Sequence, residues 1–248
     1  MPQLRLNVKL LEATQNPVTI LYCAYRQCYS AEYAVDLLME DFKKQEEFVK
    51  KMAESGHESP LEHVKFTFAV EGVSRVLTHQ LVRHRIASYS QQSQRYVKET
   101  DFDFIVPPSI ETDGELKDKF IETMSKIQTG YNEMLKALIE KGRTKEEANE
   151  DARFVLPQAI ETKIVVTMNC RELLHFYQER CCARAQWEIR DMAWKMLLIC
   201  RDHLPAVFGN AGAKCISLGY CPEGERFTCG AYPLKEKVLK RKHAAIKR

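Results

Sequence analysis

A short segment crowded with arginine constrains this chain more than any other feature of its sequence. Residues Arg83–Arg95 hold three arginines, one histidine, three serines and three glutamines within thirteen positions. Guanidiniums that converge repel one another and lose hydration, so a fold that gathers them needs an anion between them. Arginine also binds phosphate or carboxylate oxygens through two parallel hydrogen bonds. The segment therefore predicts an anion-binding site. A solvated basic loop is disfavoured, because such a loop would mix in Glu and Lys.

The end of this segment suggests a grip for a phosphate group. Ser93 and Arg95 are separated by one residue, so in extended backbone they would project the same way. The chain has neither a glycine-rich dinucleotide fingerprint nor a P-loop. A phosphate-bearing cofactor would therefore have to be held by side chains, arginine above all.

Composition indicates a globular protein. Of 248 residues, 45% are hydrophobic and 29% are charged, and no apolar run approaches the length of a membrane span. The N-terminus has no apolar signal core, so we expect a cytoplasmic location without a membrane partner. Residues 234–248 carry a net charge of +6 within a chain total of +3, which leaves −3 elsewhere. We therefore expect no nucleic-acid partner, and a solvated tail is favoured over an RNA-binding arm.

The hydrophobic periodicity predicts strands and helices without strict alternation. This favours the α+β class, with a mixed sheet packed with long helices. The expected strands are Leu4–Glu12, Val64–Val70 and Thr162–Met168. One helix is expected to begin at Asn16-Pro17. The other expected helices span Tyr33–Glu54, Val73–His84, Glu115–Lys141, Thr144–Phe154, Leu173–Gln178 and Trp187–Leu204.

Further polar residues follow the third predicted strand, a position that ligands favour. Arg171 and His175 are four residues apart and would share a helix face, whereas Arg180 would address a different ligand or the other side of the same site. Taken alone, His175 is more readily a satisfied core or surface histidine. Arg153 is equally readily a cation at a helix C-terminus.

The nine cysteines occur without an export signal, which favours reduced thiols or a metal site over disulfides. One adjacent cysteine, Cys182 or its neighbour Cys181, could join Cys215, Cys221 and Cys229 in a four-thiolate zinc or iron–sulfur site. The spacings are looser than the usual Cys-x-x-Cys pattern. The alternative is reduced cysteines packed as small hydrophobic residues.

Arg83-His84-Arg85, followed after seven intervening residues by Ser93, resembles the signature of the flavin-dependent thymidylate synthases. Other segments match that family in order: Gly56–His63, Arg153–Pro157, Asn169–Arg171 and Arg180–Ile189. The resemblance covers about residues 1–208 and implies the fold of that family, with a catalytic domain at 1–208. A Cys-rich segment at 209–233 and a basic tail at 234–248 would follow it.

The resemblance implies a methyltransferase that converts dUMP to dTMP. FAD would be the cofactor, reduced by NADPH, and methylene-tetrahydrofolate would donate the carbon. The enzyme would be a homotetramer with shared active sites. The implied FAD contacts are Ser59, Arg83, His84, Arg85, Gln91, Asn169, Arg171 and His175. The implied dUMP contacts are Gln80, Arg83, Gln91, Ser93, Gln94, Arg95, Arg153 and Arg180.

The chemistry of these residues suits those roles. Permanently protonated arginines neutralise a pyrophosphate or a reduced flavin. Arg180 would act catalytically, by stabilising charge that develops on the uracil ring. Ser93 has no neighbouring base and is interpreted as a phosphate ligand rather than a nucleophile.

The chain departs from the family pattern at two places. Ser90 and Gln91 stand where the family often has Asn and Glu, so any acid–base role at Gln91 is in doubt. Arg184 stands where a histidine is often found, which would add a cation near the flavin.

Two other interpretations remain open on the sequence. A nucleic-acid-binding protein would show steeply salt-dependent affinity, and a metal-binding or redox-sensing protein would be built around the cysteines. An absorption spectrum would separate a flavoprotein from an iron–sulfur protein.

Overall fold

The computed structural model describes residues 4–239, and it combines one sheet with separate helices, in agreement with the predicted α+β class. The sheet has four strands in the order β1-β2-β4-β3. Their bounds are β1 Asn7–Ala13, β2 Lys65–Ser74, β3 Ala87–Gln91 and β4 Glu161–Asn169. No helix in this described part has both the length and the hydrophobicity needed to cross a bilayer.

Alternating burial explains why the two central strands form. In β2, Phe66 and Phe68 are fully buried whereas Lys65 and Glu71 are exposed. In β4, Val166 is buried in the same alternating pattern. Such a period of two places one face of a strand in the core. A hydrogen bond between the Thr67 and Thr167 hydroxyls, 2.9 Å apart, joins the strands on the other face.

The chain divides into two compact units, and each of the four strands has residues in both units. Unit 1 comprises Met1–Lys9, Ala69–Arg83 and Tyr89–Val166, and unit 2 comprises Leu10–Phe68, His84–Ser88 and Thr167–Arg248. The domain limits expected at residues 208 and 233 stay predictions. Residues 240–248 of the predicted basic tail lie outside the described residues.

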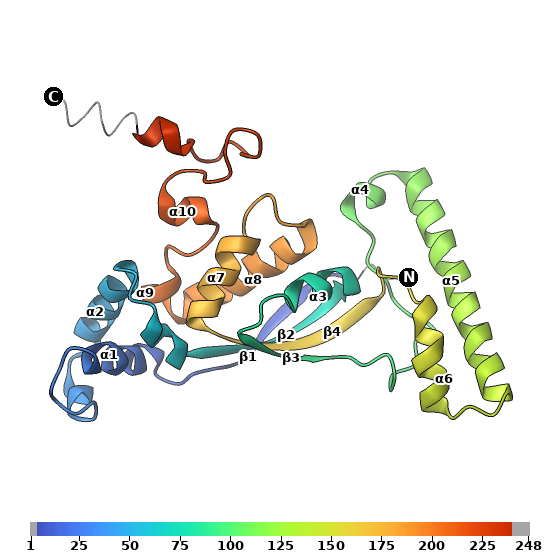
Figure 1. Cartoon of the computed structure of the whole chain (residues 1–248), viewed down its shortest axis with the longest axis horizontal. Coiled ribbons are helices and arrows are strands. Elements are labelled where there is room, and N and C mark those ends of the chain that lie inside the picture. Colours follow the sequence, from blue (N-terminus) through green and yellow to red (C-terminus); the bar gives the residue numbers. More distant parts are fainter. Residues whose placement is uncertain (1–3, 240–248) are drawn as a thin grey trace. The chain divides into compact units, whose positions relative to one another are not determined.

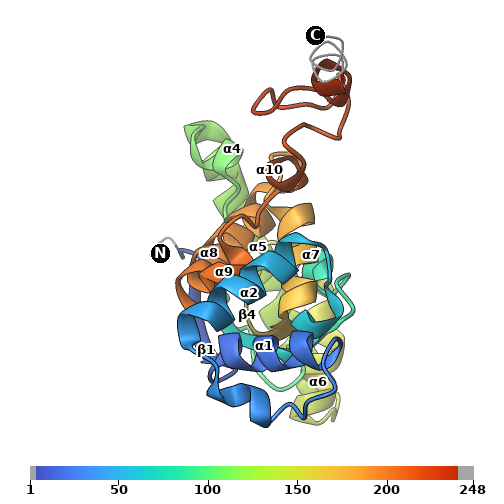
Figure 2. The same ribbon diagram turned by 90° about the vertical axis from the view of Figure 1, so that its left-hand side faces the viewer.

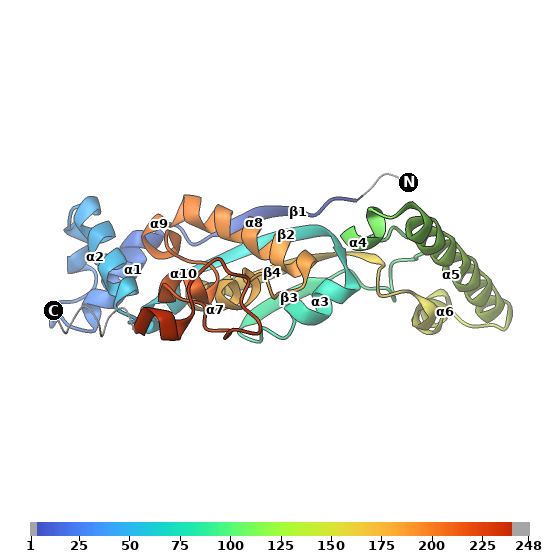
Figure 3. The same ribbon diagram turned by 90° about the horizontal axis from the view of Figure 1, so that it is seen from above.

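Unit 1 is dominated by a helical hairpin of α5 (Gly114–Glu140) and α6 (Lys145–Ala152), which lie side by side in Figures 1 and 3. Buried Tyr131 and Leu135 pack there against alanines of α6. Thr144 begins α6 with a capping box, because its hydroxyl accepts the Glu147 N–H and Glu147 bonds back to Thr144. Both helices were predicted. The unit also contains α3 (Arg75–Leu81), α4 (Pro108–Glu111) and the 3-10 turn η3 (Arg153–Val155).

Unit 2 contains the remaining helices, and Figure 2 shows α1 and α2 next to each other. Aromatic edges fill part of its core, where Phe208 lies 5.8 Å from Phe66 and 6.0 Å from Tyr177 between ring centroids. The helices are α1 Pro17–Gln27, α2 Phe42–Glu54, α7 Cys170–Arg180, α8 Trp187–His203, α9 Pro205–Phe208 and α10 Lys214–Leu218, with 3-10 turns η1 Asp36–Met39 and η2 Ser59–His63.

Three local predictions were wrong. The single helix expected over Tyr33–Glu54 is a 3-10 turn followed by α2, because the Asp41 side chain accepts the Lys43 and Lys44 N–H groups and starts a new helix. Asn16 makes no side-chain cap and instead adopts a left-handed conformation with φ of 50°. The helix α3 ends at Leu81 rather than His84.

The arginine-rich segment contains a strand that the sequence analysis did not predict. After α3, residues Ala87–Gln91 form β3 at the edge of the sheet. Beyond β3 the chain turns, and Ser93 Oγ accepts the backbone N–H of Arg95 at 3.3 Å. Ser93 and Arg95 therefore do not project from extended backbone as expected, because the serine closes a local turn.

Candidate active site

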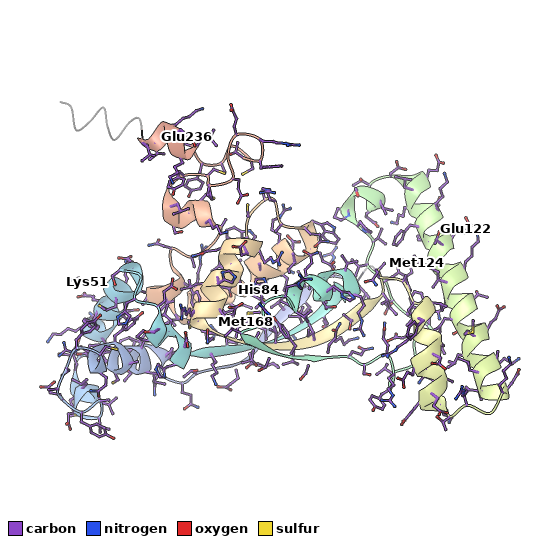
Figure 4. All side chains as sticks on the ribbon, in the orientation of Figure 1. Lys51, His84, Glu122, Met124, Met168 and Glu236 are labelled. Carbon is purple, nitrogen blue, oxygen red and sulfur yellow. The ribbon has the colours of Figure 1, made fainter. Side chains whose placement is uncertain are left out.

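His84 lies at the centre of a buried polar cluster in unit 2 and is labelled in Figure 4. Its Nδ1 is 3.2 Å from Glu172 Oε1, and its Nε2 accepts a hydrogen bond from Arg180 Nε at 3.0 Å. The Phe176 ring packs edge-on against the imidazole, with centroids 4.9 Å apart. The exposed fraction is 5% for His84 and 6% for Glu172. A histidine of the arginine-rich segment is thereby held from three sides.

One face of α7 supplies all three of these contacts. Glu172, Phe176 and Arg180 are spaced at i, i+4 and i+8, which places them along a single stripe of the helix. Asn169 starts the helix, and its side chain accepts the Glu172 N–H at 2.9 Å. The helix start therefore fixes the position of Glu172, and the helix end fixes that of Arg180.

Burial determines the protonation of this cluster. Desolvation, and then the positive charges of Arg180 and His175, lower the pKa of His84 to about 4. Burial also raises the pKa of Glu172, and His175 partly opposes that shift. The imidazole is therefore neutral at neutral pH, and its contact with Glu172 is a hydrogen bond rather than an ion pair.

Arg83 and Arg85 differ from their neighbour His84, because both are exposed. Among residues 4–239, neither guanidinium takes part in a side-chain hydrogen bond or an ion pair. Arg83 belongs to unit 1 and Arg85 to unit 2. Each of these exposed guanidiniums is, within its own unit, a donor of the kind that a phosphate-bearing cofactor requires.

Other predicted flavin contacts lie near the start of α7. Arg171 is exposed and binds Glu62 Oε1 at 2.6 Å and Glu58 Oε2 at 3.5 Å. Ser59 is exposed in the same 3-10 turn as Glu62. His175 is exposed, and its ring centroid is 5.7 Å from that of His84. The structure thus brings Arg171 to the turn of Ser59, and His175 to His84.

In unit 1, Gln91 forms a small polar network with two threonines. Its Nε2 donates to Thr78 Oγ1 at 3.0 Å and to Thr162 Oγ1 at 3.3 Å. Thr78 and Thr162 are buried, and Gln91 is half-buried. Gln80 is half-buried near the end of α3. The amide that stands in place of a carboxylate is therefore used as a donor within the protein.

The predicted phosphate contacts gather around Glu150. Arg95 Nε lies 3.0 Å from Glu150 Oε2, and Arg153 Nε donates to the Glu150 carbonyl at 3.2 Å. Ser93 and Gln94 are half-buried in the turn that precedes Arg95. The structure therefore brings Arg95 and Arg153 into contact with the same residue, Glu150. An anionic ligand here would compete with the Glu150 carboxylate for Arg95.

The predicted cysteine site is not supported. All four thiols line one cavity of about 220 Å³ between α7, α8 and the segment after α10. Burial and then the neighbouring thiols raise the pKa of Cys215. Within residues 4–239, however, no group of three or more His, Cys, Asp or Glu side chains could hold a metal ion. A zinc site needs four ligands within about 2.3 Å of one point, and Cys182, Cys215, Cys221 and Cys229 line the cavity without meeting that condition.

Arg184 makes its contacts beside the same cavity. Its guanidinium forms an ion pair with Glu223 and lies 4.4 Å from the centroid of the Phe227 ring. Its charge is therefore balanced within unit 2.

Several residues at these sites were missed by the sequence analysis. Glu172 and Phe176 lie on a different stripe of α7 from Arg171 and His175, and their four-residue spacing with Arg180 was a usable signal. Glu150 gave no signal, because it lies in an acidic stretch typical of an exposed helix.

Comparisons with known proteins bear on these sites. A family model described as Thymidylate synthase complementing protein matches residues 9–206. The chain is 56% identical to a flavin-dependent thymidylate synthase of Nitratidesulfovibrio vulgaris, over 96% of this chain and 100% of that protein. It is 48% identical to the enzyme so named from Clostridium tetani, over 93% of this chain and 96% of the relative. It is 45% identical to the flavin-dependent thymidylate synthase of Pyrococcus abyssi, over 91% of this chain and 93% of the relative.

Proposed function

This chain belongs to the flavin-dependent thymidylate synthase family, and we propose that it is an enzyme that methylates dUMP to dTMP. One observation carries the proposal. The Arg83-His84-Arg85 segment keeps both of its outer guanidiniums exposed and unpaired within the described residues, whereas its central histidine is buried and orients Arg180. Such a segment can bind an anion and direct a second cation at the same time.

The flavin is FAD, and its proposed contacts are Ser59, Arg83, His84, Arg85, Gln91, Asn169, Arg171 and His175. The donor set fits this group, because Arg83 and Arg85 offer permanent charge to a doubly negative pyrophosphate. Both ring nitrogens of His84 are engaged, so its contact would come from the backbone or the ring face. When bound and reduced by NADPH, FAD supplies a hydride.

The nucleotide is held by Gln80, Arg83, Gln91, Ser93, Gln94, Arg95, Arg153 and Arg180. Arg95 and Arg153 balance the charge of the monophosphate, with Ser93 as a further ligand. Arg180 is the catalytic residue, because a fixed guanidinium stabilises negative charge on the uracil ring in a site that excludes water. Gln91 contributes hydrogen bonds and no acid–base step.

Methylene-tetrahydrofolate is the proposed carbon donor, and the enzyme is a homotetramer in the cytoplasm. Shared active sites would let groups from different copies of the chain act on one substrate. The catalytic domain spans residues 1–208, a range supported by the family match to 9–206. The Cys-rich segment and the basic tail would lie beyond the catalytic domain.

Turnover with purified protein tests this proposal. We expect a yellow protein whose NADPH oxidation depends on dUMP, and which forms dTMP, detected by mass spectrometry, only when methylene-tetrahydrofolate is also present. A matched control is dTMP in place of dUMP, which offers no site for methylation. A colourless protein that takes up no added FAD, or one that forms no dTMP, would overturn the assignment.

A further inference from the structure

The hydrogen bond from Arg180 shows which nitrogen of His84 carries the proton. The Nε atom of an arginine always bears hydrogen and can only donate. It lies 3.0 Å from His84 Nε2, so Nε2 must present its lone pair. A neutral imidazole has one N–H group, which must then be at Nδ1.

Glu172 provides the acceptor for that Nδ1–H. Its Oε1 is 3.2 Å from Nδ1, and both side chains are more than nine-tenths buried. Its carboxylate lies in the first turn of α7, where the helix dipole favours negative charge. The Asn169 cap holds the Glu172 backbone in place. The carboxylate therefore selects the tautomer in which Nε2 is an acceptor.

Because Arg180 bonds to His84 through Nε, the two terminal nitrogens of its guanidinium remain available. Within residues 4–239, no hydrogen bond or ion pair involves its two terminal nitrogens. The other tautomer of His84 would place an N–H group against the Arg180 N–H group. Two donors would then face each other, and the guanidinium would have to turn away.

We propose that Glu172 is a positioning residue, which orients Arg180 toward the pyrimidine of dUMP by fixing the tautomer of His84. This inference rests on the proposed function, because it assigns the free end of Arg180 to that substrate. It extends the site to a buried carboxylate that is not among the proposed contacts of the nucleotide or the flavin.

Two variants of similar size separate hydrogen bonding from packing. In Glu172→Gln the amide oxygen can still accept the Nδ1–H, whereas Glu172→Leu fills the space without an acceptor. The control Glu179→Leu lies on the same helix and loses the 2.5 Å ion pair with Lys214, and Glu179 acts on His84 through its charge alone. Nitrogen-15 NMR of histidine-labelled protein reads the tautomer, and the spectrum of His84→Gln assigns the signal.

We expect Nδ1–H in the wild type, Glu172→Gln and Glu179→Leu, and Nε2–H in Glu172→Leu. Calorimetric titration with dUMP should show affinity weakened by about 10- to 100-fold in Glu172→Leu, the range for losing one buried hydrogen bond to a charged group. In Glu172→Gln the affinity should stay within about three-fold of the wild type, since one such bond is kept.

The inference is overturned if the wild type carries the proton on Nε2, a result that needs no variant to fold. It is also overturned if Glu172→Gln and Glu172→Leu lose affinity equally, because charge or packing would then be responsible. If the wild type binds no dUMP, the proposed function fails. The tautomer of His84 is then still decided separately by the NMR spectrum.

Discussion

Arg180 donates its Nε–H to Nε2 of His84 across 3.0 Å and so joins two segments 96 positions apart in the chain. Through this bond, the buried neutral imidazole of His84 holds the half-buried guanidinium of Arg180 in place. Because Glu172 engages the other ring nitrogen, we assign His84 an orienting role rather than that of a general acid or base. The catalytic charge would then belong to Arg180.

Replacing Arg180 by lysine tests that assignment. Lysine keeps the charge but lacks the planar fork and the Nε–H that meets His84. We expect kcat for dTMP formation to fall by about 10²- to 10³-fold, as when one preorganised donor is removed from an active site. The control is Arg190→Lys on α8, which loses only a 3.0 Å hydrogen bond to the Ala183 carbonyl. Equal activity in the two variants would contradict the assignment.

The buried state of His84 predicts a pH dependence of stability. The pKa of His84 is about 4 in the folded protein, against an ordinary value of 6.5, so between these pH values the unfolded chain binds a proton that the folded chain does not. Stability is therefore lost as pH falls from 6.5 towards 4, by about 3 kcal/mol for the whole shift. Urea unfolding at several pH values should show a shallower decline in His84→Gln. Parallel curves for the two proteins would rule out this origin.

Removing either exposed arginine should weaken flavin binding. A charge-assisted hydrogen bond to a phosphate contributes about 1.5–3 kcal/mol, so we expect the Kd for FAD to rise by about 10- to 100-fold in Arg83→Ala and in Arg85→Ala. The flavin absorbance retained on dialysis measures this. Lys51→Ala, an exposed lysine on α2 labelled in Figure 4, is the control for loss of charge alone. Unchanged Kd values in both arginine variants would remove these residues from the proposed flavin site.

Gly72 should resist replacement for a backbone reason. Its φ is +68°, and an added Cβ would lie 2.4 Å from the Arg5 carbonyl oxygen. We expect Gly72→Ala to lose at least about 2 kcal/mol of unfolding free energy. Gly130→Ala is the matched control, because that glycine lies inside α5 with open space around it. Alanine there should gain about 0.5–1 kcal/mol in helix propensity. Equal urea midpoints for the two variants would refute the expectation.

Local sequence patterns predicted the long elements well. The helices α5 and α6 follow from their apolar periodicity and from Thr144, and the strand β2 follows from its alternation. The short edge strand β3 was missed because Ala87–Gln91 is polar, and its strand form depends on pairing within the sheet. The turn at Ser93 was missed because a serine can bond to its own backbone neighbours, a choice that periodicity does not record.

The candidate site divides in a similar way. The arginines of the opening segment and Arg180 were identified by residue type and by resemblance in linear order. The residues that contact His84, Arg95 and Gln91 were not, namely Glu172, Glu150 and Thr162, because a buried or paired side chain has the same letter as a solvated one. The four cysteines predicted to form a metal site do line one cavity, but spacing could not show that they fail to converge on a point.

The sequence by itself determined which residues are proposed to carry the chemistry and to which family the chain is similar, because both are written in short linear segments. Only the tertiary structure decided that His84 is buried, that Glu172 binds it from 88 positions away, and that Arg180 thereby has a direction. The physical reason is that periodicity specifies which face of an element is apolar. It does not specify which distant face will pack against it, and both hydrogen bonds and pKa values depend on that packing.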